Sequence, residues 1–263
     1  MALSDLPRST YYYYVATDNK PDKYADVKER IREIFNANKG RYGYRRILYC
    51  LRAKNYVINH KTVQKLMKEL NLCCKVRLKK YRSYRGEVGK IAPNILQRNF
   101  AAQKPNIKWV TDVTEFNILG QKIYLSPMLD LFNGEVVEYA ASLTPDYRQV
   151  SEMLNKALGK IAGTKGLMIH SDQGWQYQMK VYQRALAEKG ITQSMSRKGN
   201  CLDNAVMENF FGHLKSELLY IQKFTSVEQF MNELHEYIRY YNNDRIRLKL
   251  NGLSPVQYRL QTV

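Results

Sequence analysis

The sequence predicts an α/β protein in which a mixed sheet is flanked by helices and preceded by a small all-α helix-turn-helix region. Up to residue 70, apolar residues recur every three or four positions, which is typical of short helices. Beyond Pro105, strand-like and helix-like patterns alternate. Residues 1–100 hold 23 Lys and Arg against 8 Asp and Glu, a formal charge of +15, whereas residues 101–263 hold 19 against 16, or +3. The basic first part is therefore expected to bind a polyanion. Nucleic acid is favoured over acidic lipid or a mere aid to solubility, because no amphipathic helix with a bulky apolar face stands beside the charge.

Residues 1–20 are expected to form an N-terminal helical segment that Ser9 or Thr10 caps, and residues 21–74 a helix-turn-helix DNA-binding domain. Its first helix ends at Gly40, its second runs from Arg41 to about Asn55, and Asn59 caps the third. The apolar positions expected to face inward are Val27, Ile31, Ile34, Phe35, Ile47, Leu48, Leu51, Val63, Leu66, Met67 and Leu70.

The outward face of the third helix is basic and polar, as in a helix that enters the major groove of DNA. The predicted DNA contacts of this domain are Arg45, Arg46, His60, Lys61, Gln64 and Lys65. A small helical bundle with a solvated basic face is the alternative.

Residues 75–103 are predicted to be a basic linker. Residues 75–90 alone hold seven basic residues and one acid, with Tyr81 and Tyr84 between them. Such a segment cannot bury a core, so we expect it to become ordered on DNA, with Lys79, Lys80 and Arg82 neutralising phosphates. A linker without DNA contacts is the alternative.

Residues 104–263 are predicted to form the sheet domain, with five strands. The predicted strands are 108–116, 122–129, 135–141, 167–169 and 191–195, with Asn133-Gly134 as a hairpin turn; the predicted helices are 147–161, 181–189, 204–220 and 227–242.

Three acidic residues in this part are candidate metal ligands. Asp112 is predicted in the middle of a strand, Asp172 just past the end of another, and Glu208 one turn into a helix that Asp203 can cap. An unpaired carboxylate on a strand is costly to bury, so each needs a partner, and a divalent cation is the natural one. Asp130 is expected instead to form an ordinary pair at a strand end.

The surroundings of these acids resemble the DDE transposases of bacterial insertion sequences, of the OrfB class with a retroviral-integrase-like core. The matching motifs are Thr111-Asp112-Val113-Thr114, His170-Ser171-Asp172-Gln173-Gly174-Trp175-Gln176-Tyr177 and the segment 196–211. That family has 35 residues between its second Asp and its Glu, as Asp172 and Glu208 have here, and a Lys or Arg seven residues further on, where Lys215 stands. Segments 8–12, 42–47, 241–245 and 252–255 extend the resemblance over nearly the whole chain.

The resemblance implies an RNase H-like fold with an integrase catalytic domain at 104–263, in which Asp112, Asp172 and Glu208 bind two Mg²⁺ or Mn²⁺ ions. Lys215 is expected to hold a phosphate beside them, and Arg197 and Lys198 to contact DNA. The implied activity is cleavage and strand transfer at the terminal inverted repeats of the element and at target DNA, by a homo-oligomer that can be fused to, or cooperate with, the product of an upstream frame.

Two other classes of protein stay open at this point. An RNase H-like nuclease would share the carboxylates but would not need the long basic N-terminal region, and a non-catalytic DNA-binding regulator would leave the carboxylates idle. The chain has no run of eighteen apolar residues, no apolar signal core and no C-x-x-C pair among its four cysteines. We therefore expect a protein of the bacterial cytoplasm, associated with the nucleoid, with no membrane partner and no structural zinc.

Overall fold

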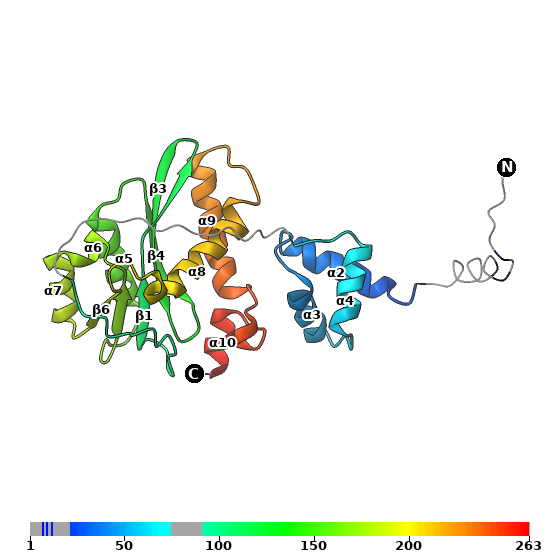
Figure 1. The fold of residues 1–263 in the computed structure, drawn as a ribbon, viewed down its shortest axis with the longest axis horizontal. Coiled ribbons are helices and arrows are strands. Elements are labelled where there is room, and N and C mark those ends of the chain that lie inside the picture. The colour runs from blue at the N-terminus through cyan, green and yellow to red at the C-terminus, as the bar shows by residue number, and fades with distance from the viewer. Residues whose placement is uncertain (1–6, 8, 10–11, 13–21, 75–90, 263) are drawn as a thin grey trace. The chain divides into compact units, whose positions relative to one another are not determined.

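The computed structural model describes residues 7, 9, 12, 22–74 and 91–262, and the chain divides into two compact units, Met1–Lys75 and Val76–Val263 (Figure 1). The predicted N-terminal helical segment lies almost entirely outside the described residues. Lys79, Lys80 and Arg82 of the basic linker also lie outside them. Within the described part of the chain, every helix is too short or too polar to cross a bilayer.

The N-terminal unit holds the three predicted helices, α2 (Ala25–Ala37), α3 (Tyr44–Ala53) and α4 (His60–Glu69). Gly40 follows α2 with a φ of 74°, a conformation that costs glycine nothing, and its N–H donates to the Phe35 carbonyl. The Asn59 side chain caps α4 by accepting from the Lys61 N–H at 2.9 Å. The buried apolar positions of the three helices are Ile31, Ile34, Phe35, Ile47, Leu48, Leu51, Val63, Leu66 and Met67. The predicted helix-turn-helix region is thus confirmed.

The C-terminal unit is built on one mixed sheet. Its strands are β1 (Lys108–Thr111), β2 (Thr114–Ile118), β3 (Gln121–Asp130), β4 (Val136–Ser142), β5 (Met168–Ser171) and β6 (Thr192–Met195). The order is β2-β3-β1-β5-β6, with β4 also paired to β3. Strands β1, β5 and β6 are parallel to one another, whereas β3 runs antiparallel to β1, β2 and β4.

The sheet has six strands where the sequence predicts five, because the strand expected at 108–116 is divided into β1 and β2. Both parts keep one register on β3: Thr111 pairs with Met128 and Thr114 with Leu125. In that register Asp112 stands across from Pro127, which has no N–H to donate to the ladder. The break therefore falls at Asp112, and this residue lies between two strands and not within one.

Helices cover both faces of the sheet (Figure 1). Helices α5 (Tyr147–Gly159), α6 (Trp175–Gln178) and α7 (Lys180–Glu188) lie on one side, and α8 (Ala205–Leu214) and α9 (Val227–Asn243) on the other. Each face of the sheet has its own hydrophobic core, and adjacent side chains of β1 point to opposite faces. Trp109 packs with α5 and α7, and Val110 packs with α8 and α9. A 3-10 turn (Cys201–Asn204) precedes α8 and a π-helical segment, η2 (Lys215–Leu219), follows it.

The C-terminus adds a 3-10 turn (Leu248–Leu250) and α10 (Pro255–Thr262), which the sequence analysis does not predict. Arg259 of α10 pairs with Asp130 at 2.5 Å, at the last residue of β3. The expected strand-end pairing of Asp130 is therefore confirmed.

Residues 91–98, here called the strap, run alongside β6 although they belong to the stretch predicted as linker. The Met195 N–H donates to the Pro93 carbonyl at 3.2 Å. The Ser194 hydroxyl oxygen accepts from the Ile95 and Leu96 N–H groups at 2.9 and 3.0 Å. These bonds make the strap part of the C-terminal unit.

Candidate active site

The carboxyl ends of the three parallel strands lie at one edge of the sheet, where α/β proteins commonly bind their ligands. Asp112 directly follows β1, Asp172 directly follows β5, and Ser196 directly follows β6. The loops after β5 and β6 are joined, because the Gln173 side chain donates to the Ser196 carbonyl at 3.0 Å. Two of the three predicted metal ligands therefore share this edge.

Asp112 is partly exposed, and both of its carboxylate oxygens are hydrogen-bonded. Oδ1 accepts from the Val113 N–H at 2.7 Å, and Oδ2 accepts from Nδ2 of Asn204 at 3.1 Å. Burial, and then repulsion by Asp172 and Glu208, raise the pKa of Asp112 well above its ordinary value, although the Val113 N–H and Lys215 oppose that shift. Asp172 and Glu208 are thus close enough to Asp112 to disfavour its charge, and a cation would relieve that repulsion.

Asp172 is held by the tight turn that follows β5. Its Oδ1 accepts from the Gly174 N–H at 2.8 Å, and burial raises the pKa of its carboxyl. A Cβ atom at Gly174 would stand 2.9 Å from that same Oδ1, so a side chain there would displace the carboxylate. Beneath the turn, the hydroxyl of buried Tyr177 lies 3.3 Å from Oγ1 of Thr111. Burial, and then the charges of Asp112 and Asp172, raise the pKa of Tyr177, so this hydroxyl stays protonated beside them.

Glu208 and Lys215 stand at the two ends of α8. The buried side of this helix, Met207, Phe210, Phe211 and Leu214, is fixed in the core. Glu208 is partly exposed, and burial raises the pKa of its carboxyl. Burial lowers the pKa of Lys215, while the charges of Asp112 and Glu115 raise it, and its Nζ lies 5.7 Å from the ring centroid of Phe116. Lys215 therefore lies within electrostatic reach of Asp112, although it opens a π-helical segment and not a further α-helical turn.

All the candidate ligands are carboxylates, the hard oxygen donors that Mg²⁺ and Mn²⁺ prefer. As arranged in the described part of the chain, no three carboxylate, imidazole or thiol side chains form a ready metal site. The chemistry of the donors and the repulsion that Asp172 and Glu208 exert on Asp112 fit a divalent cation.

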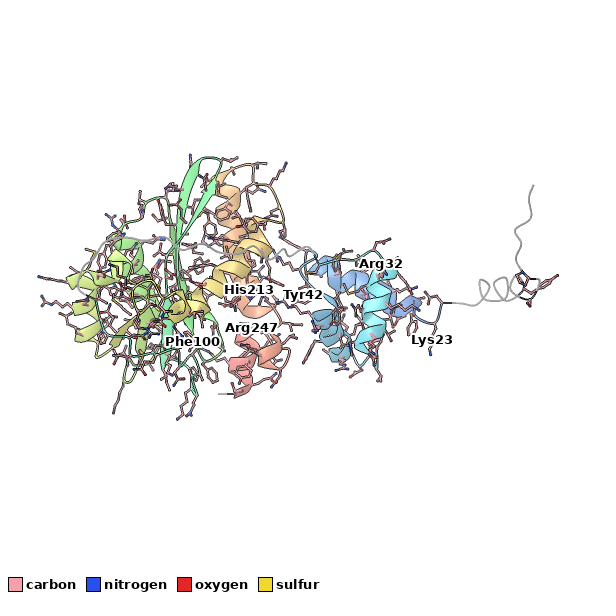
Figure 2. All side chains as sticks on the ribbon, viewed as in Figure 1. Lys23, Arg32, Tyr42, Phe100, His213 and Arg247 are labelled. Carbon is pink, nitrogen blue, oxygen red and sulfur yellow. The ribbon has the colours of Figure 1, made fainter. Side chains whose placement is uncertain are left out.

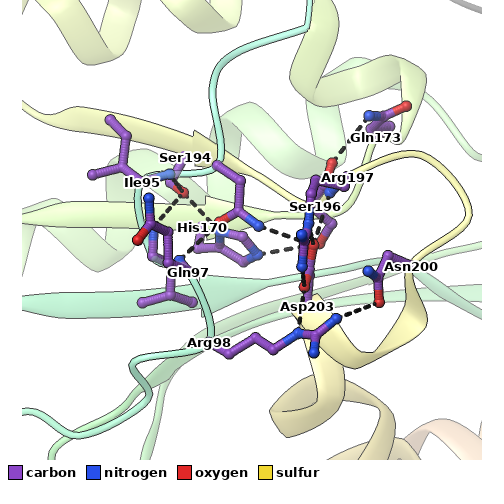
Figure 3. Close-up of polar contacts among 12 residues, drawn as sticks. Ile95, Gln97, Arg98, His170, Gln173, Ser194, Ser196, Arg197, Asn200 and Asp203 are labelled. Atoms are coloured by element: carbon purple, nitrogen blue, oxygen red, sulfur yellow. Dashed lines mark hydrogen bonds and ion pairs between the residues drawn. The ribbon is translucent and has the colours of Figure 1, made fainter.

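Next to these carboxylates lies a buried polar cluster that the sequence analysis misses (Figure 3). Asp203 is completely buried and accepts hydrogen bonds from side chains of the strap and of the loop after β6. From the strap, Nε of Arg98 donates at 2.8 Å and Nδ2 of Asn94 at 2.9 Å. From the loop after β6, Arg197 donates three times: through Nε at 2.9 Å, through a terminal guanidinium nitrogen at 3.0 Å and through its backbone N–H at 3.1 Å. Arg197 holds the pKa of Asp203 far below its usual range.

The prediction that Asp203 caps the helix of Glu208 is wrong, because its carboxylate is engaged by these arginines. Asn204 occupies the N-cap position of α8, and its side chain makes no capping hydrogen bond.

His170, two residues before Asp172, is also fully buried. Its Nδ1 lies 2.9 Å from the Ser194 hydroxyl and its Nε2 lies 3.1 Å from the Ser196 hydroxyl (Figure 3). Burial lowers the pKa of His170 to about 4, so the ring is neutral near pH 7. The neutral ring therefore links β5 to β6 and to the loop that follows it through these two hydrogen bonds.

The residues predicted to contact DNA are distributed over both units. Those exposed on α3 and α4 are Arg45, His60, Lys61, Gln64 and Lys65. Arg46 is partly buried, with its guanidinium 5.3 Å from the ring centroid of Tyr42, which Figure 2 labels. In the C-terminal unit, Lys198 is exposed, and Arg197 stays 59% exposed while it pairs with Asp203.

Comparison with known proteins shows the family of this chain. The family model described as "Integrase core domain" matches residues 102–201, a second model of the same description matches 208–263, and an "HTH-like domain" matches 22–80. The InsK protein of insertion sequence element IS150 from Escherichia coli K12 is 56% identical over 259 residues, covering 98% of this chain and 92% of that protein. The chain belongs to the insertion-sequence transposases with an integrase core.

Other members of this transposase family are more distant. The transposase of IS904 from Lactococcus lactis is 35% identical, covering 88% of this chain and 92% of that protein. Transposase InsF of IS3A from Escherichia coli K12 is 33% identical, covering 85% and 78%.

A chain of the simian T-cell lymphotropic virus intasome, solved in complex with PP2A regulatory subunit B56 gamma, matches with a TM-score of 0.52 at 18% identity, covering 77% of this chain and 67% of that chain. This last match supports the fold alone. The family predicted from the motifs is confirmed.

Proposed function

We propose that this transposase binds the ends of an insertion sequence and catalyses DNA strand cleavage and strand transfer at a site formed by Asp112, Asp172 and Glu208. DNA transposition is the function of the family. The observation that carries the residue assignment is the convergence of three partly exposed carboxylates: Asp112 and Asp172 directly follow the parallel strands β1 and β5, and Glu208 of α8 lies near enough to act on the charge of Asp112.

The three carboxylates would hold two divalent ions, Mg²⁺ or Mn²⁺. When bound, such ions activate a water or 3′-hydroxyl nucleophile and stabilise the leaving oxygen of an in-line displacement at phosphorus. The three carboxylates would hold the ions in position, so none of them needs to act as a nucleophile. The Gly174 N–H fixes one oxygen of Asp172, and the Val113 N–H fixes one oxygen of Asp112.

Lys215 supplies the positive charge of the site. Its place within electrostatic reach of Asp112 suits a contact with the phosphate that reacts, since an ammonium group meets a phosphate as a point charge. Arg197 and Lys198, on the loop after β6, would meet the DNA backbone further out along the same edge.

The N-terminal unit would supply recognition of the element ends. His60, Lys61, Gln64 and Lys65 lie exposed along α4, as expected of a helix that enters the major groove. The protein would act on DNA as a homo-oligomer in the bacterial cytoplasm, with or without the product of an upstream frame.

Joining of a labelled element end to a target plasmid in Mg²⁺ tests the proposal. Asp112→Asn, Asp172→Asn and Glu208→Gln should each abolish cleavage and joining while mobility-shift assays show DNA binding close to wild type, because the phosphate contacts are untouched. Glu152→Gln, at an exposed position of α5, is the matched control and should join normally.

A nuclease would cleave the end without joining it, and a regulator would bind and do neither. A carboxylate variant that joins at the wild-type rate would remove that residue from the site.

A further inference from the structure

We infer that Asn204 is a positioning residue of the active site, which fixes the carboxylate of Asp112 for metal binding. The inference rests on the proposed function, since it assumes that Asp112 is a metal ligand. Its basis is one hydrogen bond, one unpartnered atom and the rigid cluster that precedes Asn204 in the chain.

Asn204 is 4% exposed, and its Nδ2 donates to Oδ2 of Asp112 at 3.1 Å. The Val113 N–H holds the other oxygen of the same carboxylate at 2.7 Å. With one donor on each oxygen, the carboxylate plane cannot rotate freely, yet each oxygen keeps a lone pair for a cation. An amide donates this hydrogen bond without a charge, so it orients Asp112 without competing with the metal as a lysine or arginine would.

The side chain of Asn204 is not explained by its position at the start of α8. Asparagine is a favoured N-cap residue because its Oδ1 accepts from the first free N–H groups of the helix. Here Asn204 makes no such bond, and its buried Oδ1 has no hydrogen-bond partner among the described residues. An unmet buried acceptor is unfavourable, because it gives up its hydrogen bonds to water without replacing them. The Asn204 side chain is therefore oriented toward Asp112 and not toward the N–H groups of α8. Its Oδ1 stays available to accept from a water molecule that accompanies a bound ion.

The residue before Asn204 keeps this geometry rigid. Asp203 is completely buried, and Arg98 of the strap and Arg197 of the loop after β6 donate to it from two segments (Figure 3). Arg98 also donates to Oδ1 of Asn200, at the start of the 3-10 turn that ends at Asn204. The backbone that leads to Asn204 is thereby held at the start of the turn, at Asn200, and again at Asp203, directly before Asn204.

The test measures Mn²⁺ binding by the full chain, using the electron paramagnetic resonance signal of free Mn²⁺. Asn204→Ala removes the donor, and Asn204→Leu removes it while filling a similar volume. Both should weaken Mn²⁺ binding by roughly 10- to 100-fold, the usual effect of losing a group that orients a metal ligand. Asn209→Ala, at an exposed position of the same helix, is the matched control and should bind like wild type. Thermal unfolding of each variant, followed by circular dichroism, should stay close to wild type.

Asp112→Asn is measured alongside to separate this inference from the proposed function. If Asp112→Asn loses Mn²⁺ binding and both Asn204 variants keep it, the inference is overturned and the metal site stands. If Asp112→Asn binds Mn²⁺ like wild type, the proposed site fails and the inference fails with it. Loss of the unfolding transition in both Asn204 variants would show that Asn204 only supports the fold, which would also overturn the inference.

Discussion

The pairing of Glu217 with Arg245 offers a sharp test of how the C-terminal unit is held together. Nε of Arg245 donates to Oε2 of Glu217 at 2.8 Å, and a terminal guanidinium nitrogen donates to Oε1 at 2.6 Å. The hydroxyl of Tyr237 donates to Oε2 at 3.2 Å. Both charged side chains are at most 3% exposed, so the pair has almost no contact with water.

Arg245→Met should strongly destabilise this unit, because it leaves the Glu217 carboxylate buried without its cation. Removing one partner of a buried ion pair costs about 3–5 kcal/mol. For a unit of this size, each kcal/mol lowers the unfolding midpoint by about 2–4 °C, so the expected fall is roughly 6–20 °C.

Scanning calorimetry and chemical denaturation of the full chain would measure this loss. The matched control is Arg184→Met, which breaks the exposed pair of Arg184 with Glu188 and should cost less than about 1 kcal/mol. Replacing both buried partners, in Glu217→Leu with Arg245→Met, should recover most of that loss, since an apolar pair carries no desolvation penalty; the Tyr237 hydroxyl still loses its Glu217 acceptor. An Arg245→Met variant within about 1 kcal/mol of wild type would refute this reasoning.

Four further variants test the candidate site, the cluster beside it and the N-terminal unit. Gly174→Ala would place a Cβ atom 2.9 Å from Oδ1 of Asp172, so joining should slow while DNA binding is unchanged; normal joining would show that the turn can adjust. Lys215→Ala should slow joining of a labelled end without stopping Mn²⁺ binding, and Lys215→Arg should keep part of the activity, whereas an alanine variant with the wild-type rate would mark a solvated lysine. Asp203→Asn should cost about 1.5–3 kcal/mol at neutral pH, because it weakens charge-assisted hydrogen bonds while Arg98 and Arg197 stay partly exposed to water. The pKa of Asp203 is lowered in the folded state, so its carboxylate contributes its full stabilisation only above the unfolded pKa of about 3.9. The difference in stability between wild type and Asp203→Asn should therefore shrink as the pH falls below that value. Denaturation curves that show a constant difference across this range would contradict the prediction. Lys65→Gln should reduce the slope of log affinity against log salt by about one, and an unchanged slope in fluorescence anisotropy would exclude a phosphate contact.

Local signals predict the N-terminal unit well. The end of α2 just before Gly40 and the cap of α4 at Asn59 each depend on residues within a few positions, which a sequence shows directly. The alternation of strands and helices after Pro105 is predicted for the same reason. The candidate carboxylates of the site are predicted from their motifs and spacing, which do not require the fold to be known.

Features that depend on residues far apart in the sequence cannot be predicted from local patterns. The break at Asp112 comes from Pro127 on the neighbouring strand, so the period-2 pattern of 108–116 cannot reveal it. Asn204 and Asp112 are 92 residues apart, and Arg98 and Asp203 are 105 apart. From sequence alone Asp203 therefore has the appearance of a helix cap, because its arginine partners become its neighbours only after folding.

The strap also bears on how the catalytic unit can be produced separately. Strand β6 ends the order of the sheet, and the main-chain groups of such a strand can pair with another chain and lead to aggregation. Here Pro93 meets Met195, and Ile95 and Leu96 meet Ser194, so this border is shielded. A fragment that begins at residue 101 would lose that shield together with Arg98, one of the cations on Asp203. Fragments intended to stay monomeric and active should therefore begin before Ile91.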